Sequence, residues 1–167
     1  MNASVPPPAP AAGANVRQFD AAQDRTLSHG VPARSLLGGL PLARLIPQDV
    51  HSVMDYVHAV ATSAGVVLHD DDPAAVAASI ILGGSVLGVS LLTDYRLSVA
   101  KVIPIEAHEA VDYAWGALAI AAPFVLGYWK TSPTVGLLHV IAGTGSILGA
   151  LVTDYRSWRD RDRDLDR

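Results

Sequence analysis

The sequence contains no cysteine. A disulfide framework, a thiolate metal site and a cysteine nucleophile are therefore excluded. Charged residues are also scarce, because they make up 17% of the 167 residues, against about 25% in ordinary soluble domains. The net charge of −4 gives no general attraction to nucleic acid, and no basic stripe with interleaved aromatic residues is present. We expect no nucleic-acid partner.

The two ends of the chain have no long apolar runs. Residues 1–34 are rich in proline and alanine and lack a basic segment followed by an apolar one, so we predict no signal peptide. A segment with so little apolar surface cannot offset the entropy cost of ordering. We therefore predict a disordered cytoplasmic tail over residues 1–40. Residues 157–167 alternate in charge sign and are predicted to form a second, solvated tail.

Half of the sequence is apolar, and four long apolar runs lie between these tails, at about residues 50–68, 74–92, 107–127 and 133–152. Each run is close to the roughly 20 residues that a helix needs to cross about 30 Å of hydrocarbon. The second and fourth runs carry no charge, whereas a helix of a soluble bundle needs a broad polar face. We predict an all-α membrane domain with four transmembrane helices over residues 41–156. The first and third helices are the weaker spans.

Short connections join the four runs into two antiparallel hairpins. Pro73 and Pro133 are placed to begin the second and fourth helices, with Ser132 as a candidate N-cap. Eleven of the twelve Lys and Arg residues lie on one side of the predicted hairpins, and only Lys130 lies on the other. The positive-inside rule then places both termini and the central loop in the cytoplasm. We expect the protein in a plasma membrane, the inner membrane of a bacterial cell.

The two hairpins repeat each other. The segment ARLIPQDVHSVMDY, which begins at Ala43, matches AKVIPIEAHEAVDY, which begins at Ala100, and TDYR recurs after the second and fourth runs. We assign repeat one to residues 43–96 and repeat two to residues 100–156. Each copy has a histidine and an aspartate four residues apart on one helix face. The repeat is expected to gather at one cytoplasmic rim the polar residues His51, Asp55, Asp94, Tyr95, Arg96, His108, Asp112, Asp154, Tyr155 and Arg156.

These motifs resemble those of the SPW-repeat family of bacterial integral membrane proteins. The IP-x(3)-H-x(3)-D elements and the junction LLTDY, residues 91–95, are similar to the family's pattern, and AAPF at residues 121–124 is similar to its Ser-Pro-Trp core. The first hairpin departs from that core, with SAGV at residues 63–66. The resemblance covers residues 43–156. It implies an inner-membrane location and brings no activity with it.

The polar cluster has two interpretations. The first interpretation is a metal or cofactor site, because histidine and carboxylate ligands suit zinc, iron or manganese. The favoured interpretation is a structural network without a metal or cofactor. In that network Asp55 and Asp112 pair with Arg96 and Arg156, or with Arg44 and Lys101. Asp94 and Asp154 follow helix C-termini, where a carboxylate is unfavourable, and would take partners from His51, His108, Tyr95 and Tyr155.

Three further features have a functional and a structural interpretation. His139 lies in the middle of the fourth run, where we favour a structural hydrogen bond over an ionisable functional group. His69 and residues 70–72 are a weak cation site and more simply solvated loop residues. Gly84-x-x-x-Gly88 and Gly145-x-x-x-Gly149 are small-residue packing motifs that bring helix backbones close, within the chain or between two copies.

No phosphate loop, catalytic triad or nucleophile elbow is present in the sequence, so we expect no enzyme and no catalytic residue. The leading hypothesis is a non-enzymatic membrane module that acts by self-association or with another membrane protein. The alternative is a metal- or cofactor-binding accessory protein that uses the His/Asp/Tyr cluster. A small dimeric transporter is the third option.

Overall fold

The computed structural model describes residues 37, 39–68 and 71–155, and within them all regular secondary structure is helical. The predicted tails therefore lie almost wholly outside the described residues. Four long helices and one short helix follow one another along the chain. They are α2 (Gln48–Ser63), α3 (Gly65–Leu68), α4 (Pro73–Leu92), α5 (Ile105–Val125) and α6 (Pro133–Leu151).

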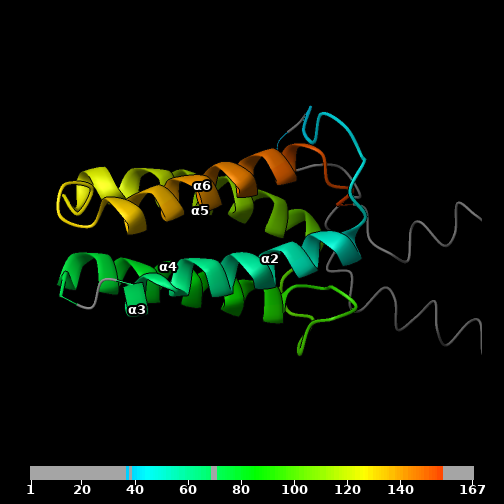
Figure 1. Ribbon diagram of the computed structural model, residues 1–167. Helices are drawn as coiled ribbons and strands as arrows, with labels where there is room; N and C mark the ends of the chain where they lie inside the picture. Colours follow the sequence, from blue (N-terminus) through cyan, green and yellow to red (C-terminus); the bar gives the residue numbers. More distant parts are fainter. Residues whose placement is uncertain (1–36, 38, 69–70, 156–167) are drawn as a thin grey trace, which may run out of the picture. The chain divides into compact units, whose positions relative to one another are not determined.

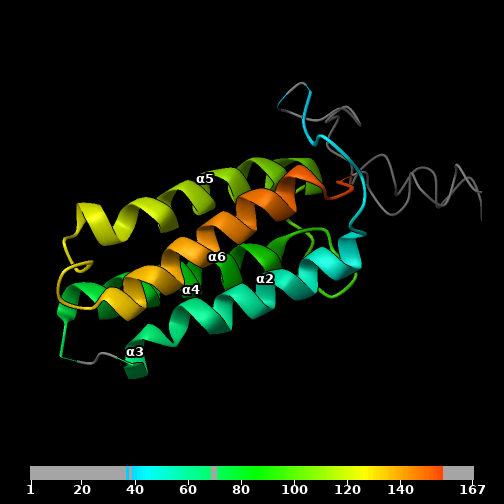
Figure 2. The ribbon, with the colours of Figure 1, turned by 45° about the horizontal axis from the view of Figure 1, so that its top comes forward.

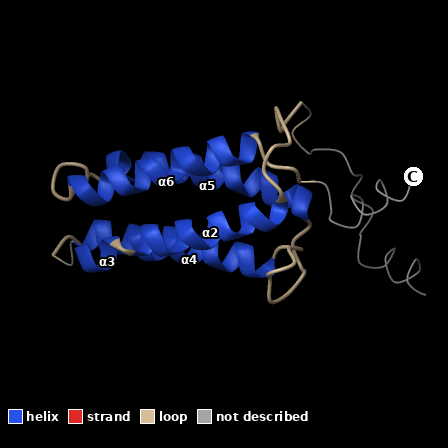
Figure 3. Ribbon diagram, turned by 45° about the vertical axis from the view of Figure 1, so that its right-hand side comes forward, coloured by secondary structure: helices blue, strands red, loops and turns tan. Residues whose placement is uncertain are grey.

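The four long helices pack as two antiparallel pairs. In Figure 1, α2 and α4 form one layer and α5 and α6 form the other. Figure 2 and Figure 3 show the same two layers from other sides. The starts of α2 and α5 and the ends of α4 and α6 lie together at one end of the bundle, which we call the rim end. The end of α3, the start of α4 and the connection from α5 to α6 lie at the opposite end, the far end.

The observed helices differ in two ways from the predicted runs. The first run is interrupted, because α2 ends at Ser63 and α3 begins at Gly65. A Cβ at Gly65 would lie 2.0 Å from Ser79 Oγ, so only glycine permits this approach to α4. Ser132 precedes α6 but makes no side-chain capping bond, because its hydroxyl donates to Asp72 instead. Pro73 and Pro133 begin α4 and α6 as predicted.

Glycine also sets the close approach of α5 and α6. A Cβ at Gly116 would lie 2.7 Å from the carbonyl oxygen of Gly143, and one at Gly143 would lie 2.5 Å from the oxygen of Gly116. The predicted packing motifs behave differently from each other. Gly145 and Gly149 face α2, whereas a Cβ at Gly84 or at Gly88 would meet no atom within 4 Å. Self-association through that open face of α4 stays a prediction.

At the rim end the two repeats exchange backbone hydrogen bonds. Ile46 pairs with Thr153 and Ile103 pairs with Thr93 in two isolated β-bridges. The segment before α2 thus binds the end of α6, and the segment before α5 binds the end of α4. These bonds use carbonyl groups that a helix leaves without partners at its C-terminus, including Val152 O, which accepts from Ile46 N at 2.9 Å. Each repeat therefore closes the end of the other.

The bundle places its polar side chains inside and many apolar ones outside. The outer faces of all four long helices carry large apolar residues, among them Val60 of α2, Ile81 of α4, Leu118 of α5 and Ile141 of α6, which are 60–74% exposed. Polar residues that are buried in the same helices include His51, Ser52, Asp55, Thr62, Ser79, Ser90, His108, Glu109, Asp112, His139 and Ser146. Two of the helices, α4 and α6, are long and apolar enough to cross a membrane.

Candidate metal centre

Two histidines and two aspartates meet between the hairpins near the rim end. His51 and Asp55 come from α2, and His108 and Asp112 come from α5. All four are buried, with 4% or less of each residue exposed. One ligand atom from each residue can be chosen so that the four atoms lie within 4.8 Å of one another. The repeat thus supplies the same pair twice, and the pairs face each other.

The distances link each histidine to both aspartates. His51 Nε2 lies 3.4 Å from Asp55 Oδ1 and 3.0 Å from Asp112 Oδ2. His108 Nε2 lies 3.1 Å from Asp55 Oδ2 and 3.1 Å from Asp112 Oδ1. In a tetrahedral site with bonds of about 2.0–2.1 Å, neighbouring ligand atoms are about 3.3–3.4 Å apart. Each histidine–aspartate distance is close to this spacing, each aspartate faces the two histidines with different oxygens, and one ligand atom from each of the four residues fits within 4.8 Å.

Threonines at the helix ends fix which nitrogen of each histidine carries a proton. Thr153 Oγ1 lies 2.8 Å from Nδ1 of His51, and Thr93 Oγ1 lies 2.7 Å from Nδ1 of His108. Each hydroxyl donates its own proton to the carbonyl four residues earlier, at Gly149 and Val89. The hydroxyl oxygen must then accept the Nδ1–H of the imidazole. A neutral imidazole held in this way directs its Nε2 lone pair to the centre of the cluster.

Hydroxyl groups hold the carboxylates in place. Tyr155 donates to Asp112 Oδ2 at 2.6 Å, and Tyr95 and Ser90 donate to Asp55 Oδ2 at 3.3 Å and 2.8 Å. Burial and the neighbouring carboxylates raise the pKa of Tyr95 and of Tyr155 well above the ordinary value. Both phenols thus stay protonated and remain donors. These hydrogen bonds hold each aspartate in a fixed orientation, as outer-shell hydrogen bonds hold metal-ligating carboxylates.

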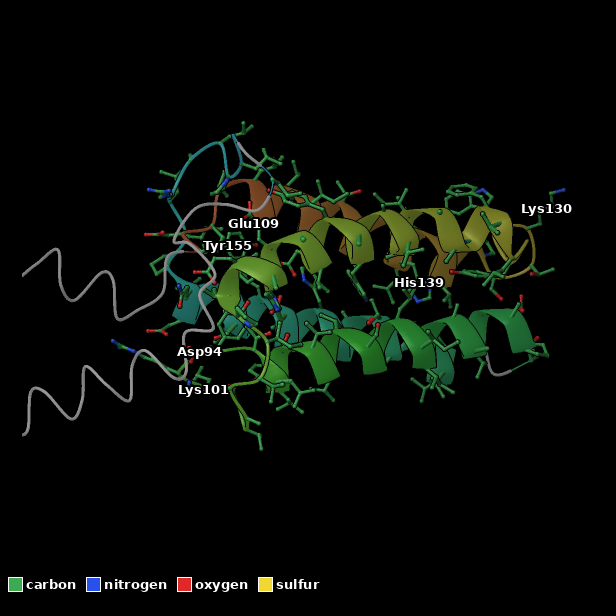
Figure 4. All side chains as sticks on the ribbon, turned by 180° about the vertical axis from the view of Figure 1, so that it is seen from behind. Asp94, Lys101, Glu109, Lys130, His139 and Tyr155 are labelled. Atoms are coloured by element: carbon green, nitrogen blue, oxygen red, sulfur yellow. The ribbon has the colours of Figure 1, made fainter. Side chains whose placement is uncertain are left out.

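The prediction that Asp55 and Asp112 pair with arginine or lysine is wrong for Arg44, Arg96 and Lys101, which form ion pairs with other aspartates. Lys101 lies 3.1 Å from Asp94, Arg44 lies 3.9 Å from Asp154, and Arg96 lies 3.6 Å from Asp49. The partners expected for Asp94 and Asp154, which were histidine or tyrosine, are replaced by these cations. Figure 4 shows Asp94, Lys101 and Tyr155 at the rim end of the bundle. Arg156 lies outside the described residues.

The described cations stay out of the cluster because Asp55 and Asp112 lie too deep in the bundle. Asp55 lies seven residues into α2, about 10 Å along the helix axis at 1.5 Å per residue. Arg44, Arg96 and Lys101 stand in the segments before and after the helices, at the rim end. Among the described residues, the side chains that reach the two carboxylates are His51, His108, Ser90, Tyr95 and Tyr155. The buried carboxylates are thus left to these imidazoles and hydroxyl donors.

Each Nε2 atom faces oxygens of both carboxylates at 3.0–3.4 Å. A proton on Nε2 would make each histidine an imidazolium that lies between two carboxylates. A neutral Nε2 would turn its lone pair toward two carboxylates, which is unfavourable without a cation. A single divalent ion satisfies the neutral form, because it accepts both lone pairs and balances two negative charges in a buried site.

His139 lies at a second polar crossing, nearer the far end than the metal centre. Its Nδ1 lies 2.7 Å from the Tyr128 hydroxyl, and its Nε2 lies 3.2 Å from Ser79 Oγ. The Ser79 hydroxyl donates to Ala75 O, so its oxygen accepts the proton on Nε2 of His139. Nδ1 of His139 then accepts the proton of the Tyr128 hydroxyl. All hydrogen-bonding positions of the imidazole are used. This agrees with the structural interpretation, and Figure 4 labels His139 within the bundle.

The sequence pattern missed some of the supporting residues. Thr93 and Thr153 belong to the repeated TDYR element, so the repeat was a signal for them even though no role had been assigned. Ser90 had no such signal, because the matching position in repeat two is Ala150, which cannot donate. Instead, Ser146 Oγ donates to the backbone oxygen of Asp112 at 3.1 Å.

Comparison of the chain with models of protein families, with curated proteins and with solved structures finds no match. The resemblance to the SPW-repeat family therefore remains a prediction from the motifs alone.

Proposed function

We propose that this protein is a small membrane metalloprotein that holds one divalent first-row transition metal between its two hairpins. The ligands are Nε2 of His51 and His108 and the carboxylates of Asp55 and Asp112. The observation that supports this most is the pair of buried Nε2 atoms that converge on two buried carboxylates, with ligand atoms of all four residues within 4.8 Å of one another. Nitrogen and oxygen ligands without thiolate suit zinc, manganese or iron.

The supporting hydrogen bonds give the proposal its second argument. In metal sites the imidazole nitrogen that does not bind the metal normally donates to a fixed acceptor, and the ligating carboxylates are hydrogen-bonded in turn. Here both histidines donate from Nδ1 to a threonine, and both aspartates accept from a tyrosine. This arrangement occurs twice, once in each repeat. A network that only joined helices would not need the same protonation state at both histidines.

The membrane location of the whole bundle is part of the proposal. The length and apolarity of α4 and α6 are consistent with this location. The other two long helices carry their polar groups on the buried side, at residues such as His51, Asp55 and Glu109, while Val60 and Leu118 face outward. An apolar exterior around a polar interior suits lipid as the surrounding solvent. We propose four spans, with the rim end in the cytoplasm.

Metal analysis of the purified protein tests the proposal. Protein is extracted from native membranes in detergent without chelator, and its metal content is measured by mass spectrometry. We expect about one metal ion per chain in the wild type and in His58→Ala, and loss of the metal in His51→Ala and His108→Ala. His58 is the matched control, because it lies on α2 outside the ligand set. Circular dichroism checks that each variant keeps its helix content.

A wild-type protein that has no metal above trace level, and takes up none from zinc, manganese or iron(II) solutions, would contradict the proposal. Equal metal content in His51→Ala and in the wild type would contradict it as well. In the first case the two histidines are protonated, and the cluster is an imidazolium–carboxylate network that joins the hairpins.

A further inference from the structure

The two repeats differ in how tightly they close around the metal centre. Between α4 and α5 lies a cavity of about 230 Å³ whose lining includes both His108 and Asp112. The rest of its wall is mostly apolar, from Val86, Val89, Val111, Ala114, Trp115 and Leu118. Leu118 is 64% exposed, and Ala114 is exposed as well, so the cavity opens on the outer apolar surface of the bundle.

At the equivalent seam between α2 and α6, two side chains of α2 lie over glycines of α6. Met54 stands where repeat two has Val111, and its terminal methyl group lies 3.2 Å from the Cβ position of Gly149. His58 stands where repeat two has Trp115, and its Nε2 lies 3.2 Å from the Cβ position of Gly145. In the seam between α2 and α6, the long side chain of Met54 thus covers Gly149. In the seam between α4 and α5, the shorter Val111 and Val89 stand at the matching positions and line the open cavity.

We propose that the cavity between α4 and α5 admits a small neutral apolar molecule from the lipid, which binds the metal through one nitrogen or oxygen atom. This inference rests on the proposed function. Manganese, iron and cobalt bind more than four ligands readily, so the four protein groups leave a coordination position for such a molecule. This open coordination position lies on the side of His108 and Asp112, which is the side that the cavity reaches.

The charges of the centre select a neutral ligand. Two carboxylates balance a divalent ion, so an additional anion would leave a net negative charge in an apolar cavity at high desolvation cost. The apolar wall favours a hydrocarbon body for the same molecule. The described residues that line the cavity include no lysine or arginine. Among the described residues, Lys101, Arg44 and Arg96 form ion pairs at the rim end with Asp94, Asp154 and Asp49, so they do not attract an anion into the cavity.

Cobalt(II) and pyridine test the inference. The detergent-solubilised full chain is loaded with cobalt(II), and its visible absorption is followed while pyridine or azide is added. We expect pyridine to change the spectrum of the wild type and azide to bind at least tenfold more weakly. Val111→Met, which copies Met54 into the open seam, and Ala114→Phe should each weaken pyridine binding at least tenfold while cobalt content stays the same.

Val57→Phe is the matched control, because Val57 occupies in repeat one the position of Ala114 and lies on the closed seam. It should bind pyridine like the wild type. The inference is overturned if cobalt binds and pyridine leaves the spectrum unchanged, if the cavity-filling variants respond like Val57→Phe, or if azide binds as tightly as pyridine. Failure of cobalt to bind at all is a different result, which contradicts the proposed function itself.

Discussion

Thr93 and Thr153 fix the Nδ1 protons of the two histidines. Each threonine gives its proton to a helix carbonyl and accepts the Nδ1 proton, so Nε2 is the nitrogen that faces the carboxylates. We predict that Thr93→Val and Thr153→Val each lower metal affinity about 10–100-fold, the usual effect of losing such an outer-shell partner. Competition with a chromophoric chelator measures the affinity.

Thr144→Val is the control for this prediction. Thr144 also donates to the carbonyl four residues earlier, Val140 O at 2.8 Å, but it is exposed and contacts no histidine in the described structure. The affinity of that variant should equal the wild-type affinity. If the three valine variants bind metal equally well, the threonines do not set the tautomer.

At the scale of the helix pair, Gly116 is a position where the backbones of α5 and α6 approach closely. A methyl group there would lie 2.7 Å from the backbone oxygen of Gly143 and 2.6 Å from Ile147 Cγ1. We predict that Gly116→Ala forces the helices apart and costs about 1–3 kcal/mol, the usual range for overpacking. Gly84→Ala should be neutral or should stabilise α4 by up to about 1 kcal/mol. Thermal unfolding in detergent compares the two variants, and equal losses would contradict the packing argument.

The far end depends on the carboxylate of Asp72. It accepts from the backbone of Ala74 and Ala75 at the start of α4 and from the hydroxyls of Thr131 and Ser132 in the α5–α6 connection. These hydrogen bonds lower the pKa of Asp72 below its ordinary value, and the bond from the Thr131 hydroxyl has the largest effect. The ionised form thus stabilises the fold above that ordinary value, and the contribution is lost as the pH falls through the lowered pKa.

We therefore predict that Asp72→Ala unfolds at a lower temperature than the wild type at pH 7. The difference should shrink toward zero as the pH falls below about 3.9, the ordinary aspartate pKa. Asp71→Ala serves as the control, since the neighbouring Asp71 is exposed. A difference that persists unchanged in acid would mean that the carboxylate charge is not what stabilises the far end.

For the whole molecule, the repeat motif places His51, Asp55, His108 and Asp112 in one predicted group, and these four side chains meet. The motif does not predict what they do, and it does not separate them from Asp94, Arg96 and Asp154, which form other ion pairs at the rim end. The ion pairs predicted for Asp55 and Asp112 are wrong, because both carboxylates lie too deep in their helices for the described cations of the rim to reach them. The interruption after Ser63 was also missed, since the close approach of Gly65 to Ser79 across the hairpin is not visible in the apolar pattern.

The insertion of both hairpins with the same polarity is a prediction for the whole chain. A protease site or a glycosylation acceptor is placed next to Lys101 in one fusion and next to Lys130 in another. We expect the site near Lys101 to report the cytoplasm and the site near Lys130 to report the opposite side. Sites that report the same side would contradict the proposed arrangement of four spans.

X-ray absorption spectroscopy of the metal in the purified protein tests the central claim most directly. The account predicts a first shell of two imidazole nitrogens and two carboxylate oxygens at about 2.0–2.2 Å, with the outer-ring scattering of imidazole. It also predicts that His108→Ala lacks one of the two imidazoles or lacks the metal altogether. A spectrum with water oxygens alone, or one that is the same in His108→Ala as in the wild type, would contradict it.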